Sequence, residues 1–209
     1  MFLKIPWWLL KPIYTSGMVL SNVEIVKAIN AGDITIQDIA GMDPAEKPFN
    51  TSAVDLRLGT EICIPRGEVP VQLDLRKPNI AKFLADNSIT KTIAHDQGYA
   101  LRAHKFVLAN THEKVDFPIR DGQCYSARVE GKSSLARCGI LVHFTAPTIH
   151  AGFNGTITLE IINLGPFDFL LYPEMYICQL IIEQVSGCPV NAPNQFAGQK
   201  KPFGVTDAS

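Results

Sequence analysis

Hydrophobic and polar residues alternate in short runs along most of the chain. In residues 52–58, Val54, Leu56 and Leu58 fall on one face, which is the period of a half-buried strand. The next residue, Gly59, is expected to end this strand. The same pattern predicts further strands at 61–64, 99–102, 106–111, 123–130, 140–144, 156–163, 169–172 and 176–183.

One segment near the start has a helical period instead. Ser21 is suited to cap a helix over 21–31, and Glu24 follows three residues later, as in a capping box. Apolar residues from Ile25 onward recur on one face, and Gly32 stands where such a helix should end. The pattern therefore predicts one short helix before the strands begin.

The remaining pattern favours a mainly all-β fold. Glycine and proline separate the short strands, and the other helical signal is a weak one around 80–85. The chain has no repeat of 20–50 residues and no alternation of strands with helices. Many short strands with turns between them are typical of a sandwich or a barrel.

Composition narrows the class of protein. The 209 residues are 46% hydrophobic and 19% charged, which suits one globular domain with a sizeable core. A net charge of −1 speaks against a nucleic-acid or membrane-surface partner, since both favour a basic face. Five cysteines, an odd number without a C-x-x-C pair, favour reduced thiols in a cytoplasmic protein.

The two ends of the chain differ from its middle. Residues 1–17 carry an apolar run too short to cross a membrane. We expect them to form an N-terminal extension, and a membrane anchor is the alternative. A single domain is expected over 18–209. From about residue 187 its tail becomes rich in proline, asparagine and glutamine, as is typical of a chain terminus without regular structure.

Several common catalytic motifs are absent from the sequence. The H-x-E and P-C-x-x-C pair of zinc deaminases does not occur, and neither does H-E-x-x-H. There is no P-loop and no G-x-G-x-x-G. We therefore expect no zinc site.

The most informative segment is 131–139, which follows a predicted strand. It brings Lys132, Ser133, Ser134 and Arg137 together within six residues. Hydroxyls, backbone N–H groups and cations in one turn are what a polyphosphate needs, although a capped surface turn would look similar.

A single carboxylate stands in the later strand 156–163. Ile157, Leu159 and Ile161 share one face of that strand, whereas Glu160 lies on the other. The pattern alone leaves open whether Glu160 is an exposed strand residue or a buried acid. In the earlier strand, Asp55 and Arg57 are expected to form a surface or subunit-interface pair, and His143 is expected in the core or at an interface.

Together these segments resemble known sequence motifs. Residues 131–137 resemble the G-R-S-S-L-A-R motif of dCTP deaminases and the G-R-S-G motif of trimeric dUTPases. Residues 149–155 resemble I-D-x-G-[FYW]-x-G, and 158–160 look like the strand that carries the deaminase glutamate. The matches continue in chain order at 52–59 (S-[IV]-D-[LV]-R-L-G), 172–183 (P-x-M-x-I-x-Q-L) and 195–199 (K-Y-x-x-Q). The chain is thus similar to the dCTP deaminase family of the dCTP deaminase/dUTPase superfamily.

The resemblance implies a fold and an assembly. The expected subunit is a dUTPase-like distorted barrel or jelly roll (β-clip) with a short N-terminal helix. The expected assembly is a homotrimer with active sites between subunits, over which the C-terminal tail closes.

The resemblance also assigns roles to residues. Glu160 would be the general acid/base that activates a water against C4 of cytosine. Ser133 and Arg137 would hold this water and stabilise charge around the reacting carbon, and the backbone carbonyl of Ala146 would orient the water.

Substrate contacts follow from the same resemblance. Mg²⁺ would be bound through the substrate triphosphate and not by a protein cage. The residues expected to bind nucleotide, with Phe153 at the deoxyribose, are Lys132, Ser134, His150, Phe153, Thr158, Leu159, Gln195 and Gln199. Three of them depart from the family pattern: His150 stands in place of Asp, Lys132 in place of Arg, and Gln195 in place of Lys.

Four functions remain open at this point. The main interpretation is deamination of dCTP to dUTP and ammonia. The alternative is an enzyme that also hydrolyses dUTP, giving dUMP and pyrophosphate; His150 speaks against it, because the usual Asp activates the water that attacks phosphorus. A plain dUTPase would not need Glu160, and an inactive nucleotide sensor would not need the set of Ser133, Arg137 and Glu160.

Overall fold

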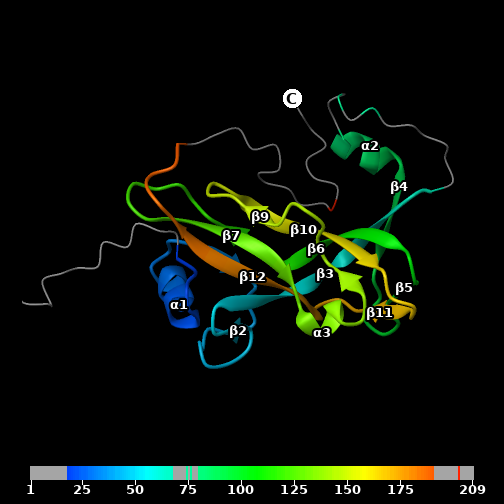
Figure 1. The fold of residues 1–209 in the computed structure, drawn as a ribbon, viewed down its shortest axis with the longest axis horizontal. Coiled ribbons are helices and arrows are strands. Elements are labelled where there is room, and N and C mark those ends of the chain that lie inside the picture. The colour runs from blue at the N-terminus through cyan, green and yellow to red at the C-terminus, as the bar shows by residue number, and fades with distance from the viewer. Residues whose placement is uncertain (1–17, 68–73, 75, 77–79, 191–201, 203–209) are drawn as a thin grey trace, which may run out of the picture.

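The computed structural model describes residues 18–67, 74, 76, 80–190 and 202 of the 209. Figure 1 shows a mostly β chain whose two longer helices, α1 and α2, lie at opposite ends. The predicted extension 1–17 and most of the tail lie outside the described residues, so the expected domain limits stay a prediction. The described elements are α1 (Asn22–Asn30), β1 (Thr35–Gln37), β2 (Phe49–Asn50), β3 (Ala53–Pro65), α2 (Ile80–Asp86), β4 (Ser88–Thr92), β5 (Tyr99–Leu101), β6 (Phe106–Asp116), β7 (Cys124–Gly131), α3 (Ser133–Ala136), β8 (Ile140–Leu141), β9 (Thr148–Ile149), β10 (Asn154–Asn163), β11 (Phe169–Leu171) and β12 (Tyr176–Val185).

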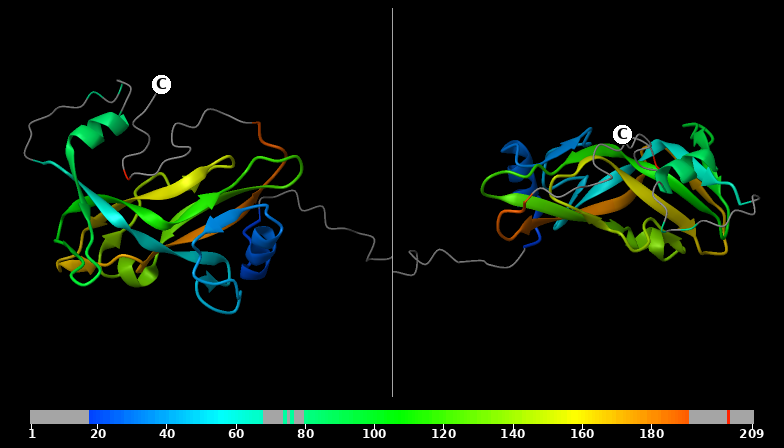
Figure 2. Two further views of the ribbon diagram at one scale, coloured as in Figure 1. Left: turned by 180° about the vertical axis from the view of Figure 1, so that it is seen from behind. Right: turned by 90° about the horizontal axis from the view of Figure 1, so that it is seen from above.

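Most strands belong to one curled sheet. Its order is β8-β10-β6-β3-β12-β7-β9, with β1 paired to β6 and with β2 and β4 paired to β3. A separate two-stranded sheet joins β11 and β5. Figure 2 shows the large sheet wrapping around the molecule, with β3 crossing from one half to the other. This confirms the predicted mainly β, barrel-like fold.

The core lies inside the curl of this sheet. Alternate side chains of β10 supply it as predicted, because Ile157, Leu159 and Ile161 are almost fully buried. The facing strand β12 contributes Leu180 and Ile182, which have no exposed surface. Burying large apolar side chains of this kind stabilises the fold by about 1.5–3 kcal/mol each.

The N-terminal helix α1 forms as the sequence predicts. The Ser21 hydroxyl accepts a hydrogen bond from the Glu24 backbone N–H at 3.3 Å, and Ile25 is fully buried. Gly32 follows with a φ of +72°, a conformation that glycine adopts without steric cost. The weak helical signal at 80–85 corresponds to α2.

Strand β3 corrects one prediction. It does not end at Gly59 but runs on to Pro65, so that two predicted strands form one. Gly59 lies where the pairing of β3 with β6 shifts register between Leu58 and Ile62. A Cβ atom at Gly59 would come within 2.9 Å of the Asn110 carbonyl oxygen. The glycine therefore marks a close backbone approach and not a strand end.

Predicted strand limits differ elsewhere as well. The prediction at 140–144 is reduced to β8, which ends at Leu141, whereas β6 continues five residues beyond the predicted end at Thr111. The other predicted strands correspond to β5, β7, β10, β11 and β12. In the described ranges, no helix has both the length and the hydropathy needed to cross a membrane.

Candidate active site

The segment singled out by its hydroxyls and cations forms a tight turn between β7 and β8. Lys132 precedes the four-residue helix α3, and its carbonyl accepts hydrogen bonds from the N–H groups of Leu135 and Ala136 at 3.0 and 2.9 Å. The backbone N–H of Arg137 donates to the Ser133 carbonyl at 3.1 Å. The turn therefore has a defined backbone, which we call the serine turn (residues 132–137).

Three polar side chains of the serine turn face solvent. Ser133, Ser134 and Arg137 are all exposed in the isolated chain. Among the described residues, none accepts a hydrogen bond from the Arg137 guanidinium. These three groups are thus available to a ligand or to a second protein copy.

Lys132 has a different environment from its neighbours. Its ammonium lies 2.6 Å from Oδ2 of Asp55 and 5.9 Å from the centre of the Tyr176 ring. The same carboxylate oxygen also binds Lys47, and Asn50 donates to the other oxygen at 2.9 Å. The predicted phosphate ligand is therefore engaged with a carboxylate in this structure.

The predicted pairing of Asp55 with Arg57 is wrong. Asp55 is only 1% exposed and binds lysines, whereas Arg57 bonds Glu113 at 2.7 Å and Glu174 at 3.4 Å. Residues two apart on a regular strand point to the same face, which is why Asp55 and Arg57 were expected to be neighbours. The pairing of β12 with β3 is irregular at this point, because the register shifts between Tyr176 and Cys178.

The pKa of Asp55 gives a test of this cluster. Burial alone would raise it, but hydrogen bonds from Lys132, Lys47 and Asn50 outweigh burial and hold it below the ordinary value of 3.8. The unfolded chain then binds the proton more readily, so the carboxylate stabilises the fold above about pH 4 and this contribution is lost as the pH falls through the lower folded pKa.

We therefore expect Asp55→Asn to lose less stability in acid than the wild type. Urea unfolding between pH 7 and pH 3 should show a shallower fall in the free energy of unfolding, by at most about 1.4 kcal/mol per pH unit for one proton. Glu24→Gln, which removes an exposed carboxylate, is the control and should follow the wild type. Parallel acid profiles for Asp55→Asn and the wild type would contradict this assignment.

The candidate acid/base, Glu160, is neither fully exposed nor buried. It is half-buried on β10, and one carboxylate oxygen accepts a hydrogen bond from the Phe144 backbone N–H at 3.3 Å. The Phe144 ring packs edge-on against Phe106, with 5.8 Å between ring centres. Among the described residues, the Phe144 N–H is thus the hydrogen-bond donor that holds this carboxylate.

The neighbours of Glu160 on β10 differ in what they offer a ligand. The Thr158 hydroxyl is enclosed, and no described residue is its hydrogen-bond partner. Leu159 has no exposed surface and belongs to the core, so its predicted contact with the nucleotide stays a prediction.

Three other predicted site residues lie in or after the segment between β8 and β10. Ala146 is exposed in the loop before β9, and His150 is exposed directly after β9. Phe153 is 4% exposed and belongs to the core, with its backbone N–H donating to the His150 carbonyl at 3.1 Å. Its predicted contact with deoxyribose stays a prediction. Gln195 and Gln199 lie outside the described residues.

The fold brings the serine turn close to the end of β10. The turn leads directly into β8, which pairs with β10 at Ile162 and Asn163. The Leu164 N–H donates to the Gly139 carbonyl at 2.8 Å. No hydrogen bond joins Glu160 to the serine turn within the described part of one chain.

Comparison with known proteins decides the family. A family model described as dCTP deaminase-like matches residues 19–185. The chain belongs to the dCTP deaminase-like family. The predicted resemblance is thereby confirmed.

The proteins that are similar in sequence to this chain have two different names. "dCTP deaminase, dUMP-forming" from Halobacterium salinarum is 36% identical over 178 residues, covering 84% of this chain and 85% of that protein. A protein of the same name from Methanothermobacter thermautotrophicus is 36% identical over 194 residues, covering 88% and 91%. "dCTP deaminase" from Thermomicrobium roseum is 32% identical over 191 residues, also covering 88% and 91%.

A solved structure has the same fold as this chain. The crystal structure of 2'-deoxycytidine 5'-triphosphate deaminase from Agrobacterium tumefaciens matches with a TM-score of 0.59 and 18% identity. The match covers 80% of this chain and 48% of that chain, so this chain spans about half its length. At this identity the comparison shows a shared fold only.

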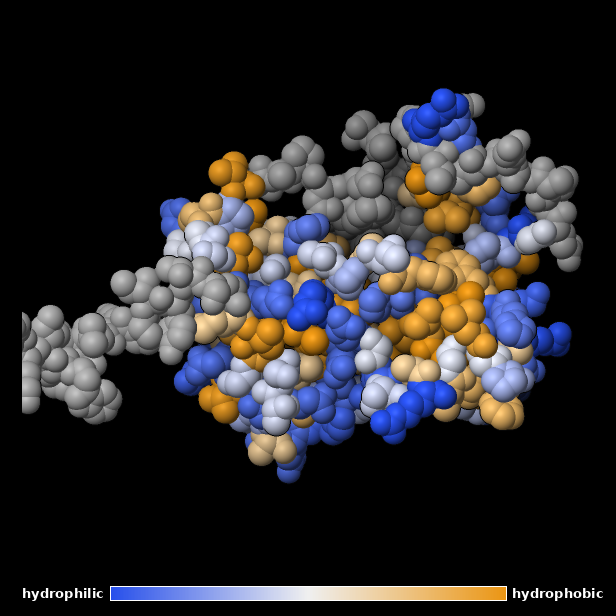
Figure 3. All heavy atoms as spheres, viewed as in Figure 1, coloured by the Kyte–Doolittle hydropathy of each residue, from blue (hydrophilic) through white to orange (hydrophobic). Residues whose placement is uncertain are grey.

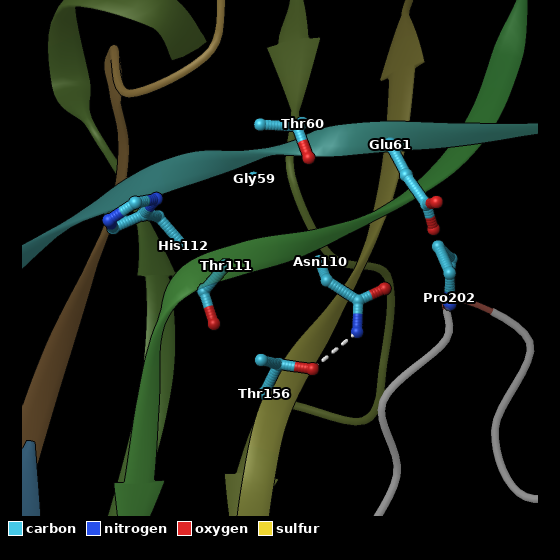
Figure 4. Close-up of a pocket in the computed structure, with 8 residues that line it drawn as sticks. All are labelled: Gly59, Thr60, Glu61, Asn110, Thr111, His112, Thr156 and Pro202. Carbon is cyan, nitrogen blue, oxygen red and sulfur yellow. Dashed lines mark hydrogen bonds between the residues drawn. The ribbon is translucent and has the colours of Figure 1, made fainter. Parts of the chain in front are cut away.

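One pocket of this dCTP deaminase-like chain was not expected from the sequence. It has a volume of about 180 Å³ and lies between β3, β6 and β10. Figure 4 shows the side chains that line it. Asn110 donates to the Thr156 hydroxyl at 2.6 Å, while its own carbonyl oxygen is enclosed and has no partner among the described residues. The eight lining residues are Gly59, Thr60, Glu61, Asn110, Thr111, His112, Thr156 and Pro202. They come from separate strands and the tail, so no local motif announces them.

Metal ligands do not cluster in the described ranges. No three or more His, Cys, Asp or Glu side chains there come close enough to hold a metal ion. The expectations about zinc and about Mg²⁺ bound through the substrate remain predictions.

Proposed function

We propose that this chain hydrolytically deaminates dCTP. The observation that carries the proposal is Glu160, a half-buried carboxylate fixed by the Phe144 N–H on a strand whose end adjoins the serine turn. A uracil nucleotide would give this acid nothing to deaminate. The names of the relatives from Halobacterium and Thermomicrobium agree with a dCTP substrate.

The proposed reaction runs through Glu160. Its carboxylate takes a proton from a water, whose oxygen forms a bond to C4 of cytosine. Glu160 passes this proton to N3 and then carries the second water proton to the amino group, so that the C4–N bond breaks, C4 keeps the oxygen as a carbonyl and ammonia leaves. Ser133 and Arg137 stabilise the charge on the tetrahedral carbon's substituents, and the Ala146 carbonyl orients the water. No zinc takes part in this scheme.

The triphosphate is proposed to bind at the serine turn. Ser134 offers an exposed hydroxyl there, and Lys132 contributes positive charge beside it. Mg²⁺ would accompany the phosphates, with Gln195 and Gln199 of the tail closing over them. Phe153, Thr158 and the Leu159 backbone are proposed to face the nucleoside.

A homotrimer with shared sites is part of the proposal. The exposed polar groups of Ser133 and Arg137 suit contact with a nucleotide held by a second copy. Figure 3 shows apolar side chains gathered over the end that carries β5 and β11, and Leu164, Phe167 and Leu170 nearby are all more than half exposed. Exposed apolar surface of this kind supports an interface. We place the enzyme in the cytoplasm, with dCTP and dUTP as its partners.

The product is proposed to be dUMP with pyrophosphate. The sequence alone favours dUTP, because His150 stands where the family has an Asp that activates water against phosphorus. The relatives named "dUMP-forming" favour the alternative instead. His150 is exposed directly after β9, and we propose that its imidazole replaces the usual Asp as the base.

Replacing His150 with alanine should separate the two steps. We expect pyrophosphate release to fall by about 100-fold, the low end for a general base, because the side chain is exposed. Ammonia release should change little, so dUTP should accumulate. His95→Ala, an exposed histidine in another loop, serves as the control. Unchanged pyrophosphate release in His150→Ala would remove His150 from this step.

One assay tests the proposed function. Purified protein is incubated with dCTP or dUTP and Mg²⁺ while ammonia, dUTP, dUMP and pyrophosphate are followed. Ammonia with dUMP and pyrophosphate supports the proposal, and ammonia with accumulating dUTP supports a plain deaminase. Pyrophosphate from dUTP without ammonia from dCTP, or binding without turnover, would overturn it.

A further inference from the structure

The carboxylate of Asp55 is completely enclosed, yet it reaches the serine turn through a lysine. Its side chain has no exposed surface, and Lys132, the residue before Ser133, donates to it at 2.6 Å. In this structure the side chain therefore offers no surface to a nucleotide, and its contact with Lys132 is the route by which it can act on the serine turn.

A second side chain, on β12, contacts the residue that precedes the serine turn. The Gln179 amide donates to the Gly131 carbonyl at 3.2 Å. Gln179 lies on β12 opposite Asp55 on one side and opposite Glu130 on the other. Strands β3 and β12 thus bring one side chain each to the two residues that precede Ser133.

We propose that Asp55 and Gln179 are positioning residues that fix the serine turn for the reaction. This inference rests on the proposed function, because it takes Ser133 and Arg137 as the groups that hold the attacking water. It assigns a task to a buried carboxylate that the proposed mechanism does not use.

The backbone of the turn explains why its start must be fixed. Helix α3 has four residues, and the Lys132 carbonyl accepts two of the hydrogen bonds that form it. Displacing Lys132 therefore displaces Ser133 and, one helical turn later, Arg137. A shift of about 1 Å in a catalytic group can cost about 100-fold in rate. The Lys132 ammonium also lies 5.9 Å from the centre of the Tyr176 ring, a favourable contact for a cation.

The charges around Asp55 also favour a fixed position for Lys132. Burial of Asp55 favours the neutral acid, but its three donors keep the pKa of the carboxyl below the ordinary value. It is therefore ionised at neutral pH and attracts Lys132 inward. Lys47, whose side chain is 56% exposed, shares the same oxygen and is the more easily displaced of the two lysines.

The test is the steady-state kinetics of Asp55→Asn with dCTP. We expect kcat to fall by about 100-fold, while KM changes by less than about threefold, because positioning acts on the chemical step. If Lys132 served only as a phosphate ligand, its release from Asp55 would alter KM and leave kcat intact, which would overturn the inference. Glu113→Gln is the matched control, because it removes another buried carboxylate that holds Arg57 and not the serine turn. An equal loss of kcat in this control would also overturn it.

Two further variants keep the test independent of folding defects in Asp55→Asn. Lys132→Met changes a side chain that is 21% exposed, and Gln179→Leu removes the second contact. Both should lower kcat, and combining Lys132→Met with Asp55→Asn should cost no more than the larger single effect, since both act through one contact. Additive losses would contradict a shared task. A wild type that releases no ammonia would overturn the proposed function and this inference together, whereas normal kcat in Asp55→Asn and Lys132→Met would overturn this inference alone.

Discussion

Replacing Glu160 with glutamine should lower the rate of ammonia release from dCTP by about 10²- to 10⁴-fold, the usual contribution of a general acid/base. Glutamine has nearly the same shape and still accepts the hydrogen bond from the Phe144 N–H, so the strand should keep its structure. It cannot take or return a proton at the reacting carbon. Ammonia release and dCTP affinity, measured on the same preparation, check the prediction.

The control for this variant is Glu183→Gln. Glu183 is also a partly exposed glutamate on a long strand, but its carboxylate pairs with Arg128 at 2.9 Å. Its replacement should leave kcat within about twofold of the wild type, as is usual for surface sites. Deamination by Glu160→Gln at the level of this control would remove Glu160 from the mechanism.

Replacing Ser133 with alanine should lower kcat by about 10²- to 10³-fold, the loss seen when one preorganised donor to a developing charge is removed. The neighbouring Ser134→Ala is the matched comparison. Because Ser134 is proposed to bind phosphate, its loss should raise KM for dCTP more than it lowers kcat. The kinetic constants of both variants, measured with dCTP and Mg²⁺, check this difference. A raised KM with normal kcat in Ser133→Ala would contradict its role beside the water.

Mixing inactive variants tests whether the site is shared between copies. If Glu160 and Ser133 of one site come from different copies, Glu160→Gln and Ser133→Ala should complement each other after subunit exchange. In a 1:1 cyclic mixture roughly a quarter of the sites would then be intact. Recovery of activity near that level supports a shared site, and no recovery after verified exchange would place both residues in one copy.

The sequence predicts the parts of this molecule that depend on local pattern. The Ser21 cap, the alternation of β10 and the serine turn all follow from residues close together in the chain. The strand end predicted at Gly59 is wrong because glycine is common both at strand ends and where two backbones approach closely. The Asn110 carbonyl, which comes from a distant part of the chain, shows that the second case applies. Short elements such as β2 and β9 carry too few residues for a period to be recognised.

Contacts between segments that are distant in the chain could not be predicted from the sequence. Asp55 and Lys132 are 77 positions apart, and their ion pair depends on the order in which β3, β12 and β7 lie side by side. The two residues carry no local signal for each other. The same holds for Glu113, whose contact with Arg57 replaces the expected pair. The residues of the proposed site were found because a family motif names them, while the residues that hold them in place had to come from the fold.

The most direct measurement is a crystal structure of Glu160→Gln with dCTP and Mg²⁺. The account predicts that the side chain at position 160 lies within hydrogen-bond distance of the cytosine amino group or N3, with a water held between Ser133, Arg137 and C4. It also predicts the triphosphate at Ser134. A cytosine ring bound away from position 160, or a serine turn that contacts no part of the nucleotide in any copy, would contradict the account.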